Sequence, residues 1–388
     1  MRSVVPRRTR FQGLCAQVTE MARALGPDAR LPTVLQLRDT LCTSVATVDS
    51  VLKELEAQKV LYRRHGVGIF VSPSLDQRVI GLVCAPEFLT VPGTSPFWEL
   101  LVRHARARAE SCREELAFHF AAHASEEAPP ARPQLQDGLA TDVAVGRLDG
   151  LILVGLSKVT ADWVEAQGVP CVAFAGPGPC TVATDGCELV RLAARALVDQ
   201  GCRRVALWSP LAPYRRPLEK SMDPPEVAAL CGELEAQGIP YVASLTCRGG
   251  ADPAGPVGPR SSHQEQGFQT AHRVFAVPRE QWPDGLIIAD DMMTLGALAA
   301  FDQLGVRPGV DVRVVSHANR GSTALLGREQ GLMLLEMDPE EVVQGLFDLL
   351  ETRLHGREPE EPHLRVQPRW RLPEASQPAA PSGGQPSP

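Results

Sequence analysis

The chain has 388 residues, of which 44% are hydrophobic and 22% are charged, and these proportions are typical of folded domains and exclude global disorder. No apolar run reaches the ~18 residues of a transmembrane helix, and polar residues follow Arg7-Arg8, so neither a membrane span nor an export signal is predicted. We therefore expect a cytoplasmic protein, and at roughly 150 residues per domain the length predicts two or three domains.

Charge is divided unevenly along the chain. The net charge is -7, yet residues 1–74 hold 11 of the 39 Lys and Arg residues and only 6 of the 46 acidic ones. The rest of the chain holds 28 basic against 40 acidic residues. A small basic segment on a larger acidic body suggests that the N-terminal part binds a polyanion, although a solvated basic surface without a partner is the alternative.

The first 73 residues predict three helices and a β-hairpin. Apolar residues recur at helical spacing over residues 10–25. Thr33 is a candidate N-cap of a short second helix, and Ser44 is one of a third helix over residues 44–58. Residues 60–71 predict two short strands around a glycine turn. Two helices joined by a tight turn form a helix-turn-helix, whose second helix enters the major groove of DNA. The apolar stripe expected on the third helix consists of Val48, Val51, Leu52 and Leu55.

This segment resembles the winged-helix domain of the GntR family of bacterial transcription regulators over roughly residues 10–73. The resemblance depends on Leu31-Pro32, on Ser44 followed by Thr47-Val48, and on the wing at residues 62–71. It implies double-stranded operator DNA as a partner. For the hydroxyl residues among the candidates, a role as a cap or turn residue is equally open. The candidate DNA-binding residues are Arg38, Thr43, Ser44, Thr47, Lys53, Arg63, Arg64, His65 and Gly66.

Three positions depart from the pattern of that family. Leu35 stands where an arginine or another polar residue is usual, and Val45 and Asp49 stand where the family has or often has arginine. Arginine binds guanine and phosphate, whereas valine can only pack on a thymine methyl group, and Asp49 would repel phosphate or accept from a cytosine amino group. Two hypotheses stay open: the operator is unusual and affinity depends on backbone contacts, or DNA binding has weakened.

Strands and helices alternate beyond a short polar hinge at residues 74–78. This alternation indicates an α/β fold of parallel sheets with helices on both faces, which binds ligands at the carboxyl ends of the strands. The predicted strands are 79–85, 116–120, 148–154, 171–174, 204–208, 241–245, 285–288 and 312–316. The predicted helices are 97–115, 158–168, 186–201, 224–238, 263–277 and 291–304.

Several stretches of residues 79–375 resemble the effector-binding domain of the LacI/GalR regulators, which is related to periplasmic sugar-binding proteins. The main ones are residues 78–83 with Pro96-Phe97, Gly267-Phe268 and residues 287–298, the last being the most diagnostic. The resemblance implies a two-lobed periplasmic-binding-protein-like domain that forms a homodimer. The tail at residues 376–388 is rich in Pro, Gly and Ser and is predicted to be disordered.

The ligand residues of that family transfer only in part. Asp185 and Asp291 match, and a carboxylate at the mouth of a sheet can accept hydrogen bonds from sugar hydroxyls, although Asp291 could instead cap the helix that follows it. The usual arginine three residues before Gly267 is Gln264, and the usual Gly-Phe-Asp is Ser316-His317-Ala318. Because few basic residues are in view, a neutral sugar or polyol is favoured over a phosphorylated ligand.

Two aromatic residues complete the candidate effector site. Phe97 or Trp98 could stack on a pyranose ring, although each could equally be an ordinary core residue. His317 and Asn319 could take over polar contacts from the missing family residues. The candidate effector-binding residues are Phe97, Trp98, Asp185, Gln264, Asp291, His317 and Asn319.

These features predict a ligand-responsive transcription regulator that acts as a repressor. The alternative is a cytoplasmic small-molecule sensor whose N-terminal domain no longer recognises a DNA sequence, because Leu35, Val45 and Asp49 replace the usual contacts. An enzyme that uses Asp290 and Asp291 as a carboxylate pair is disfavoured, since adjacent residues at a helix start point in different directions. No catalytic motif, cofactor or metal site is predicted, and the 10 cysteines, which include no C-x-x-C pair, are expected to be reduced.

Overall fold

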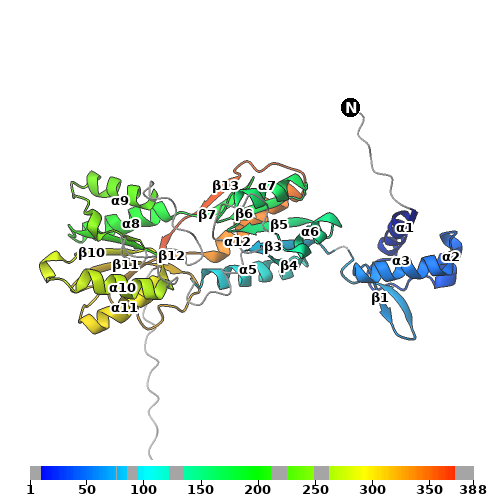
Figure 1. Cartoon of the computed structure of the whole chain (residues 1–388), viewed down its shortest axis with the longest axis horizontal. Coiled ribbons are helices and arrows are strands. Elements are labelled where there is room, and N and C mark those ends of the chain that lie inside the picture. Colours follow the sequence, from blue (N-terminus) through cyan, green and yellow to red (C-terminus); the bar gives the residue numbers. More distant parts are fainter. Residues whose placement is uncertain are drawn as a thin grey trace, which may run out of the picture. The chain divides into compact units, whose positions relative to one another are not determined.

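A computed structural model describes residues 10–75, 77–84, 95–121, 135–210, 225–248 and 262–371. The chain divides into two compact units (Figure 1), one formed by Met1–Arg78 with Arg113–Glu115 and the other by Val79–Cys112 with Leu116–Pro388. Each unit has hydrophobic core residues of its own. None of the helices in the described ranges has the length and apolar character needed to cross a membrane. The tail predicted at residues 376–388 lies outside the described residues.

The first unit is a winged helix-turn-helix, as the sequence predicts. Thr33 caps the second helix in a capping box with Gln36, and Ser44 caps the third by accepting a hydrogen bond from the backbone N–H of Thr47. The stripe predicted on the third helix is buried in the core of the unit. The elements are α1 (Arg10–Leu25), α2 (Val34–Thr40), α3 (Val45–Ala57), and the antiparallel strands β1 (Leu61–Arg64) and β2 (Gly68–Val71).

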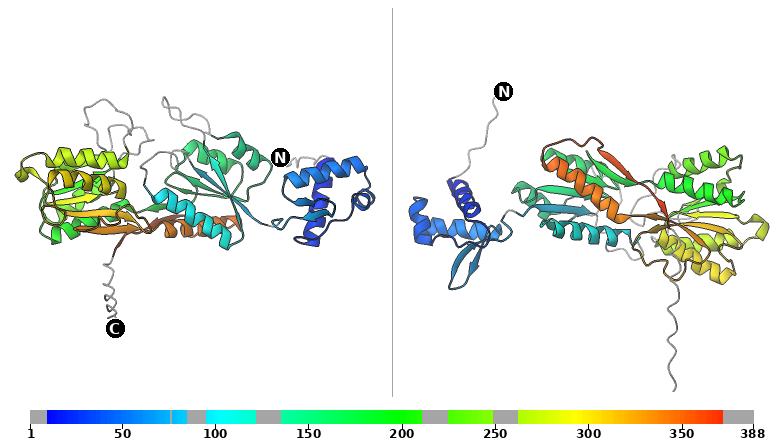
Figure 2. Two further views of the ribbon diagram at one scale, coloured as in Figure 1. Left: turned by 90° about the horizontal axis from the view of Figure 1, so that it is seen from below. Right: turned by 180° about the vertical axis from the view of Figure 1, so that it is seen from behind.

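The second unit contains two 6-stranded sheets, each with helices on both faces (Figure 2). In the first lobe, Ile80 and Leu82 face one pair of helices and Val83 faces the other pair. Strands buried on both faces explain why the sequence shows continuous apolar runs. The strand order is β4 (Glu115–Phe120), β3 (Val79–Cys84), β5 (Gly150–Val154), β6 (Cys171–Phe174), β7 (Thr181–Thr184) and β13 (His363–Val366). Its helices are α5 (Phe97–Ser111) and α12 (Pro339–Leu354) on one face, and α6 (Asp137–Ala144) and α7 (Lys158–Ala166) on the other.

The second lobe repeats this plan. Its central strands are parallel, and only the pair of β12 with β14 is antiparallel among the pairings described here. The strand order is β9 (Cys247–Arg248), β8 (Val205–Ser209), β10 (Gly285–Ile288), β11 (Arg313–Asn319), β12 (Leu332–Met337) and β14 (Arg369–Trp370). Helices α8 (Gly186–Asp199) and α9 (Pro225–Ala236) cover one face, and α10 (His263–Phe275) and α11 (Asp291–Leu304) cover the other. The α/β architecture of two parallel sheets is therefore confirmed.

Two predicted elements need correction. The strand predicted at residues 241–245 is a turn that contains a short 3-10 helix, Ala243–Leu245, and the strand β9 follows it. Only Leu245 of this 3-10 helix is buried, so the segment lacks the continuous burial of a central strand. The helix predicted at 97–115 ends at Ser111, because Glu115 already begins β4. The described helices and strands that were not predicted are α6, β7, β9, β12, α12, β13 and β14, and the 3-10 helix Arg279–Gln281 was not predicted either.

Helices α10 and α11 pack with their backbones in direct contact at two glycines. A Cβ atom at Gly296 would lie 1.8 Å from the carbonyl oxygen of Gln264, and one at Gly267 would lie 1.9 Å from that of Met293. No side chain fits at such distances, so both positions require glycine. The contact brings the first residue of α10, His263, next to Asp290, the residue that caps α11.

Replacing Gly296 with Ala should force the two helices apart. We expect the free energy of unfolding to fall by about 3 kcal/mol, which is the upper part of the usual range for overpacking. Urea denaturation followed by circular dichroism measures the change. The control is Gly232→Ala in α9, where an added Cβ atom meets nothing within 4 Å, so this variant should be more stable by up to about 1 kcal/mol. An unchanged urea midpoint for Gly296→Ala would show that the helix contact is not a constraint.

Candidate functional site

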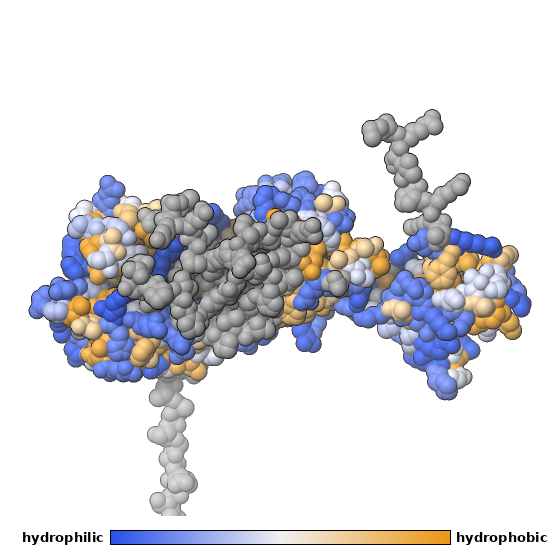
Figure 3. Space-filling view, in the orientation of Figure 1, coloured by the Kyte–Doolittle hydropathy of each residue, from blue (hydrophilic) through white to orange (hydrophobic). Residues whose placement is uncertain are grey.

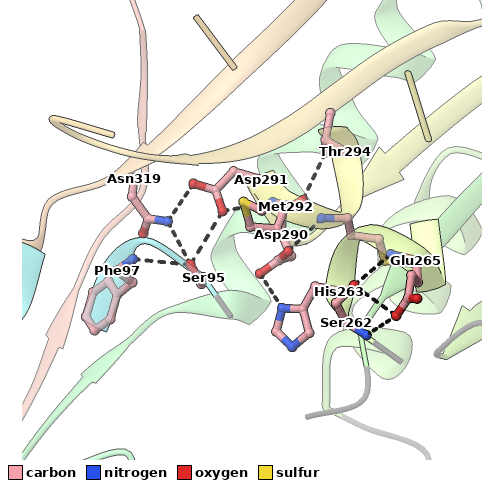
Figure 4. Close-up of polar contacts among 11 residues, drawn as sticks. Ser95, Phe97, Ser262, His263, Glu265, Asp290, Asp291, Met292, Thr294 and Asn319 are labelled. Carbon is pink, nitrogen blue, oxygen red and sulfur yellow. Dashed lines mark hydrogen bonds and ion pairs between the residues drawn. The ribbon is translucent and has the colours of Figure 1, made fainter. Parts of the chain in front are cut away.

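A cluster of polar side chains lies at the carboxyl ends of β10 and β11 (Figure 4). Asp291 follows β10, and Asn319 is the last residue of β11. Because parallel strands end at the same edge of a sheet, the two side chains meet, and the Asn319 amide donates to Asp291 Oδ2 at 2.9 Å. Ser95, which precedes α5 of the first lobe, accepts from the same amide at 3.1 Å and donates to Asp291 Oδ1 at 3.4 Å. The cluster therefore combines residues of both lobes.

Asp290 and Asp291 have different roles although they are adjacent. Asp290 caps α11, since its Oδ1 accepts from the backbone N–H of Met293 at 2.8 Å, and its Oδ2 lies 3.1 Å from Nδ1 of His263. Asp291 is the first residue of the helix and is only 1% exposed. The alternative that Asp291 is the cap is therefore wrong, and its carboxylate is directed instead to Asn319 and Ser95.

Burial raises the pKa of the Asp291 carboxyl above its ordinary value, and the neighbouring charge of Asp290 adds to this effect. The groups that oppose the increase are the imidazole of His317, the amide of Asn319 and the backbone N–H of Met292. An imidazole carries charge only when it is protonated. The Asp291 carboxylate thus accepts hydrogen bonds from neutral donors and interacts with the His317 imidazole. Within the described residues, it is not held by a guanidinium or an ammonium group.

Buried polar atoms without hydrogen-bond partners gather at this edge of the sheet. In the described structure they include Oδ1 of Asn319, Nδ1 of His317 and Nε2 of His263. Buried polar groups are nearly always paired in native proteins, because an unpaired group costs roughly 1–3 kcal/mol. Such atoms are therefore candidate contacts for a polar ligand. Nδ1 and Nε2 of a neutral imidazole can each donate or accept, and Oδ1 of Asn319 needs a donor.

The structure places the predicted effector residues in four different environments. Asp291, His317 and Asn319 come together at the end of the second sheet. Phe97 is a core residue that stacks on Phe174 with 5.2 Å between ring centroids, and Trp98 packs edge-on against Phe97. The core alternative is thus what the structure describes for Phe97, whereas Trp98 is half-buried and packs against the core. The backbone N–H of Phe97 also contacts Ser95.

The remaining two candidates are not part of the cluster in the described contacts. Asp185 caps α8, accepting from the backbone N–H of Glu188 at 2.9 Å, where the chain passes from the first lobe to the second. Gln264 is exposed on α10. Ser95, His263 and Asp290 were not among the predicted ligand residues. Their only local signals are a serine before Pro96-Phe97 and polar residues at helix starts, which are common in any sequence.

Most predicted DNA-binding cations of the winged helix are paired. Lys53 lies 3.1 Å from Asp49, Arg63 lies 3.0 Å from Glu56, and Arg38 lies 2.6 Å from Asp39. Arg64 donates to the Tyr62 hydroxyl at 2.8 Å. Ion pairs at exposed positions contribute little free energy, so a phosphate group can replace the acid at little cost.

The predicted hydroxyl and wing residues occupy two surfaces of the same unit. Ser44 accepts from the backbone N–H of Thr47 at 3.1 Å and also contacts its hydroxyl, so the cap role is present while the side chain stays exposed. Thr43 is half-buried between α2 and α3. His65 and Gly66 form the turn of the wing, where Gly66 has a φ of 71°.

Comparison with known proteins agrees with both parts of this description. Residues 21–71 match the family model "Bacterial regulatory proteins, gntR family", and residues 194–372 match the model "Periplasmic binding protein-like domain". No curated protein matches the chain by sequence. The two resemblances noted in the sequence are thereby confirmed.

Solved structures of similar fold include a regulatory protein of the LacI family from Chloroflexus aggregans, with a TM-score of 0.60 and 19% identity, covering 75% of this chain and 96% of that one. The Lac repressor dimer bound to operator and the anti-inducer ONPF has a TM-score of 0.56 and 19% identity, with coverages of 76% and 92%. A LacI family transcriptional regulator from Lactobacillus casei with bound sucrose has a TM-score of 0.55 and 14% identity, with coverages of 76% and 98%. At these identities the likeness establishes the fold.

Asp291→Asn tests whether the buried carboxylate lowers the stability of the folded protein. A raised pKa means that the folded state binds the proton more tightly than the unfolded chain, so stability falls as pH rises from the ordinary value of 3.8 through the higher folded value. Asn keeps the size of the side chain and removes the charge. We expect Asp291→Asn to melt above the wild type at pH 7 and close to it near pH 4, as measured by thermal unfolding across this range.

Asp311→Asn is the matched control, because the pKa of Asp311 is shifted in the opposite direction. Hydrogen bonds from Arg307 and Arg279 hold the pKa of the Asp311 carboxyl well below its usual range, so its stabilisation is present at neutral pH and is lost on acidification. This variant should melt below the wild type at pH 7. If Asp291→Asn behaved in the same way, the buried carboxylate would be a stabilising group and our interpretation would be wrong.

Proposed function

We propose that this transcription regulator, which joins a gntR-type winged helix-turn-helix to a periplasmic-binding-protein-like ligand-binding domain, is a cytoplasmic repressor. It binds operator DNA as a homodimer and is released when a sugar-like small molecule binds at the cluster of Ser95, Asp291 and Asn319. The observation that supports a ligand most directly is the set of unpaired buried polar atoms at this cluster. The winged helix supports the DNA part of the proposal.

Coupling between ligand binding and DNA binding follows because the cluster contains residues of both lobes. Ser95 belongs to the first lobe, whereas Asp291 and Asn319 belong to the second, and all three are hydrogen-bonded. A ligand that binds these groups more tightly in one arrangement of the lobes shifts the population toward that arrangement. In a homodimer, such a shift would change the separation of the two winged helices, which must match half-sites about 34 Å or a multiple apart.

The chemistry of the cluster supports a neutral sugar or polyol as the effector. Hydroxyl groups both donate and accept, so they can satisfy the carbonyl oxygen of Asn319 and the free ring nitrogens of His317 and His263. A phosphorylated ligand would face the carboxylates of Asp290 and Asp291 and would need cations that the described site lacks. Sucrose is bound in the structure of the Lactobacillus casei regulator, which shares this fold.

One observation favours a second candidate function. Leu35 and Val45 are exposed at positions where the GntR resemblance implies polar residues. These features support a small-molecule sensor whose winged helix binds DNA weakly and without sequence preference.

The repressor proposal predicts salt-sensitive binding to a duplex taken from the region upstream of its own gene. Each phosphate contact lowers log K by about 0.9 per unit of log salt concentration, so a few contacts give a decrease of ten- to a thousandfold between 50 and 200 mM salt. Fluorescence anisotropy with and without neutral sugars measures both DNA affinity and release. Asn319→Ala is the control, since it should abolish release and leave DNA affinity unchanged. A chain that binds no duplex in a salt-sensitive way has no role on DNA.

Replacing Val45 and Asp49 with arginine discriminates between the two functions. If the protein is a repressor, the wild type binds a specific duplex, and the double variant shifts the preference toward guanine by about tenfold or more, because a bidentate Arg–guanine contact is worth roughly 1–3 kcal/mol. If it is a sensor, only the double variant shows sequence preference. Duplex selection from a randomised library with each protein measures the difference.

A further inference from the structure

Three apolar side chains are exposed on the helix-turn-helix and wing of this chain. Leu35, in the first turn of α2, is 57% exposed, Val45, the first residue of α3, is 43% exposed, and Val67, in the wing turn, is 51% exposed. Apolar surface is visible on this unit in Figure 3. These side chains have no place in the core, which is completed by other residues of the same helices. Their exposed apolar surface is therefore available to a partner on the outside.

The polar groups on the exposed face of α3 have partners within the unit. Lys53 is paired with Asp49, and the Ser44 and Thr47 hydroxyls are paired with each other at 2.8 Å. The exposed first turn of α3 thus presents Val45 and Ala46. N-terminal residues of a recognition helix are those that reach base edges in the major groove.

Only one group on the edges of the bases in the major groove is apolar, the C5-methyl group of thymine. Guanine and cytosine offer acceptors and an amino group, which valine and leucine cannot satisfy. We propose that Val45 recognises a thymine methyl group in the operator, so that this chain selects thymine where arginine at the same position would select guanine. The inference rests on the proposed DNA-binding function and specifies the bases that it recognises.

The experiment removes the methyl groups one at a time. A duplex is first selected with the full-length protein from a randomised library, and each thymine in it is then replaced by deoxyuridine, which differs only in lacking the methyl group. We expect one or two thymines per half-site to show about a fourfold increase in Kd, which is the effect of exposing one buried methylene-sized group. The other thymines should show no change.

Substitutions in the protein test which residue is responsible for the difference in Kd between the thymine and uracil duplexes. With Val45→Ala, which leaves less apolar surface to contact a methyl group, the preference for the thymine duplex over the uracil duplex should shrink at one of the sensitive positions. The Val45 side chain is exposed, so this variant should not affect folding, which circular dichroism verifies. The matched control is Val310→Ala, at a valine of the other unit that is 67% exposed, and this variant should keep the full fourfold preference.

The outcomes separate this inference from the function on which it rests. A selected duplex whose affinity is unchanged by every uracil substitution overturns thymine recognition and leaves the DNA-binding function in place. Failure to select any duplex overturns both. If Val45→Ala weakens self-association of the protein and leaves the uracil effect intact, Val45 forms a contact between copies of the chain, and the inference is also overturned.

Discussion

The backbone contact between α10 and α11 is the constraint on which the candidate effector site depends. Gly267 and Gly296 let the two helices touch, and this contact places the first residue of α10 beside the cap of α11. As a result His263 holds one oxygen of Asp290 while the helix end holds the other. The carboxylate of Asp291 is then the one that contacts Asn319 and Ser95 of the first lobe. A side chain at either glycine would separate these groups, because backbone atoms cannot move aside as a flexible side chain can.

The site that results is costly for the folded protein. Burial opposes ionisation of Asp291, and polar atoms of Asn319 and two histidines lack partners. A sequence optimised for stability alone would fill this edge with apolar residues, as it does in the core on either side. A hydroxyl-rich ligand would supply the missing partners, and part of its binding free energy would come from groups that the protein leaves unsatisfied. Since Ser95 lies in the other lobe, the same contacts connect binding to the arrangement of the lobes.

Elements whose signals are local were predicted well. Thr33 and Ser44 mark their helices because a side-chain oxygen next to unpaired N–H groups is favourable in almost any context. The short apolar run at 241–245 was ambiguous, since periodicity cannot distinguish a buried strand from a turn over five residues, and a hydrogen bond from Tyr241 to Thr246 favours the turn. Helix α12 was not predicted, although Asp338 and Pro339 form a complete local start signal. The sequence therefore contained the information needed to predict this helix.

The sequence by itself determined the two kinds of domain and the identity of the polar residues at the strand ends, because hydrophobic periodicity and capping act over a few neighbouring residues. Only the tertiary structure decided which of these residues meet. As aspartates, Asp290 and Asp291 are equally able to cap a helix. The backbone conformation decides that Asp290 is the cap. Ser95 and Asp291 are far apart in sequence, and their contact exists only because two sheets and the α10–α11 packing bring them together. Asp185 has the same chemistry but lies at a crossover between the lobes, where it caps a helix instead.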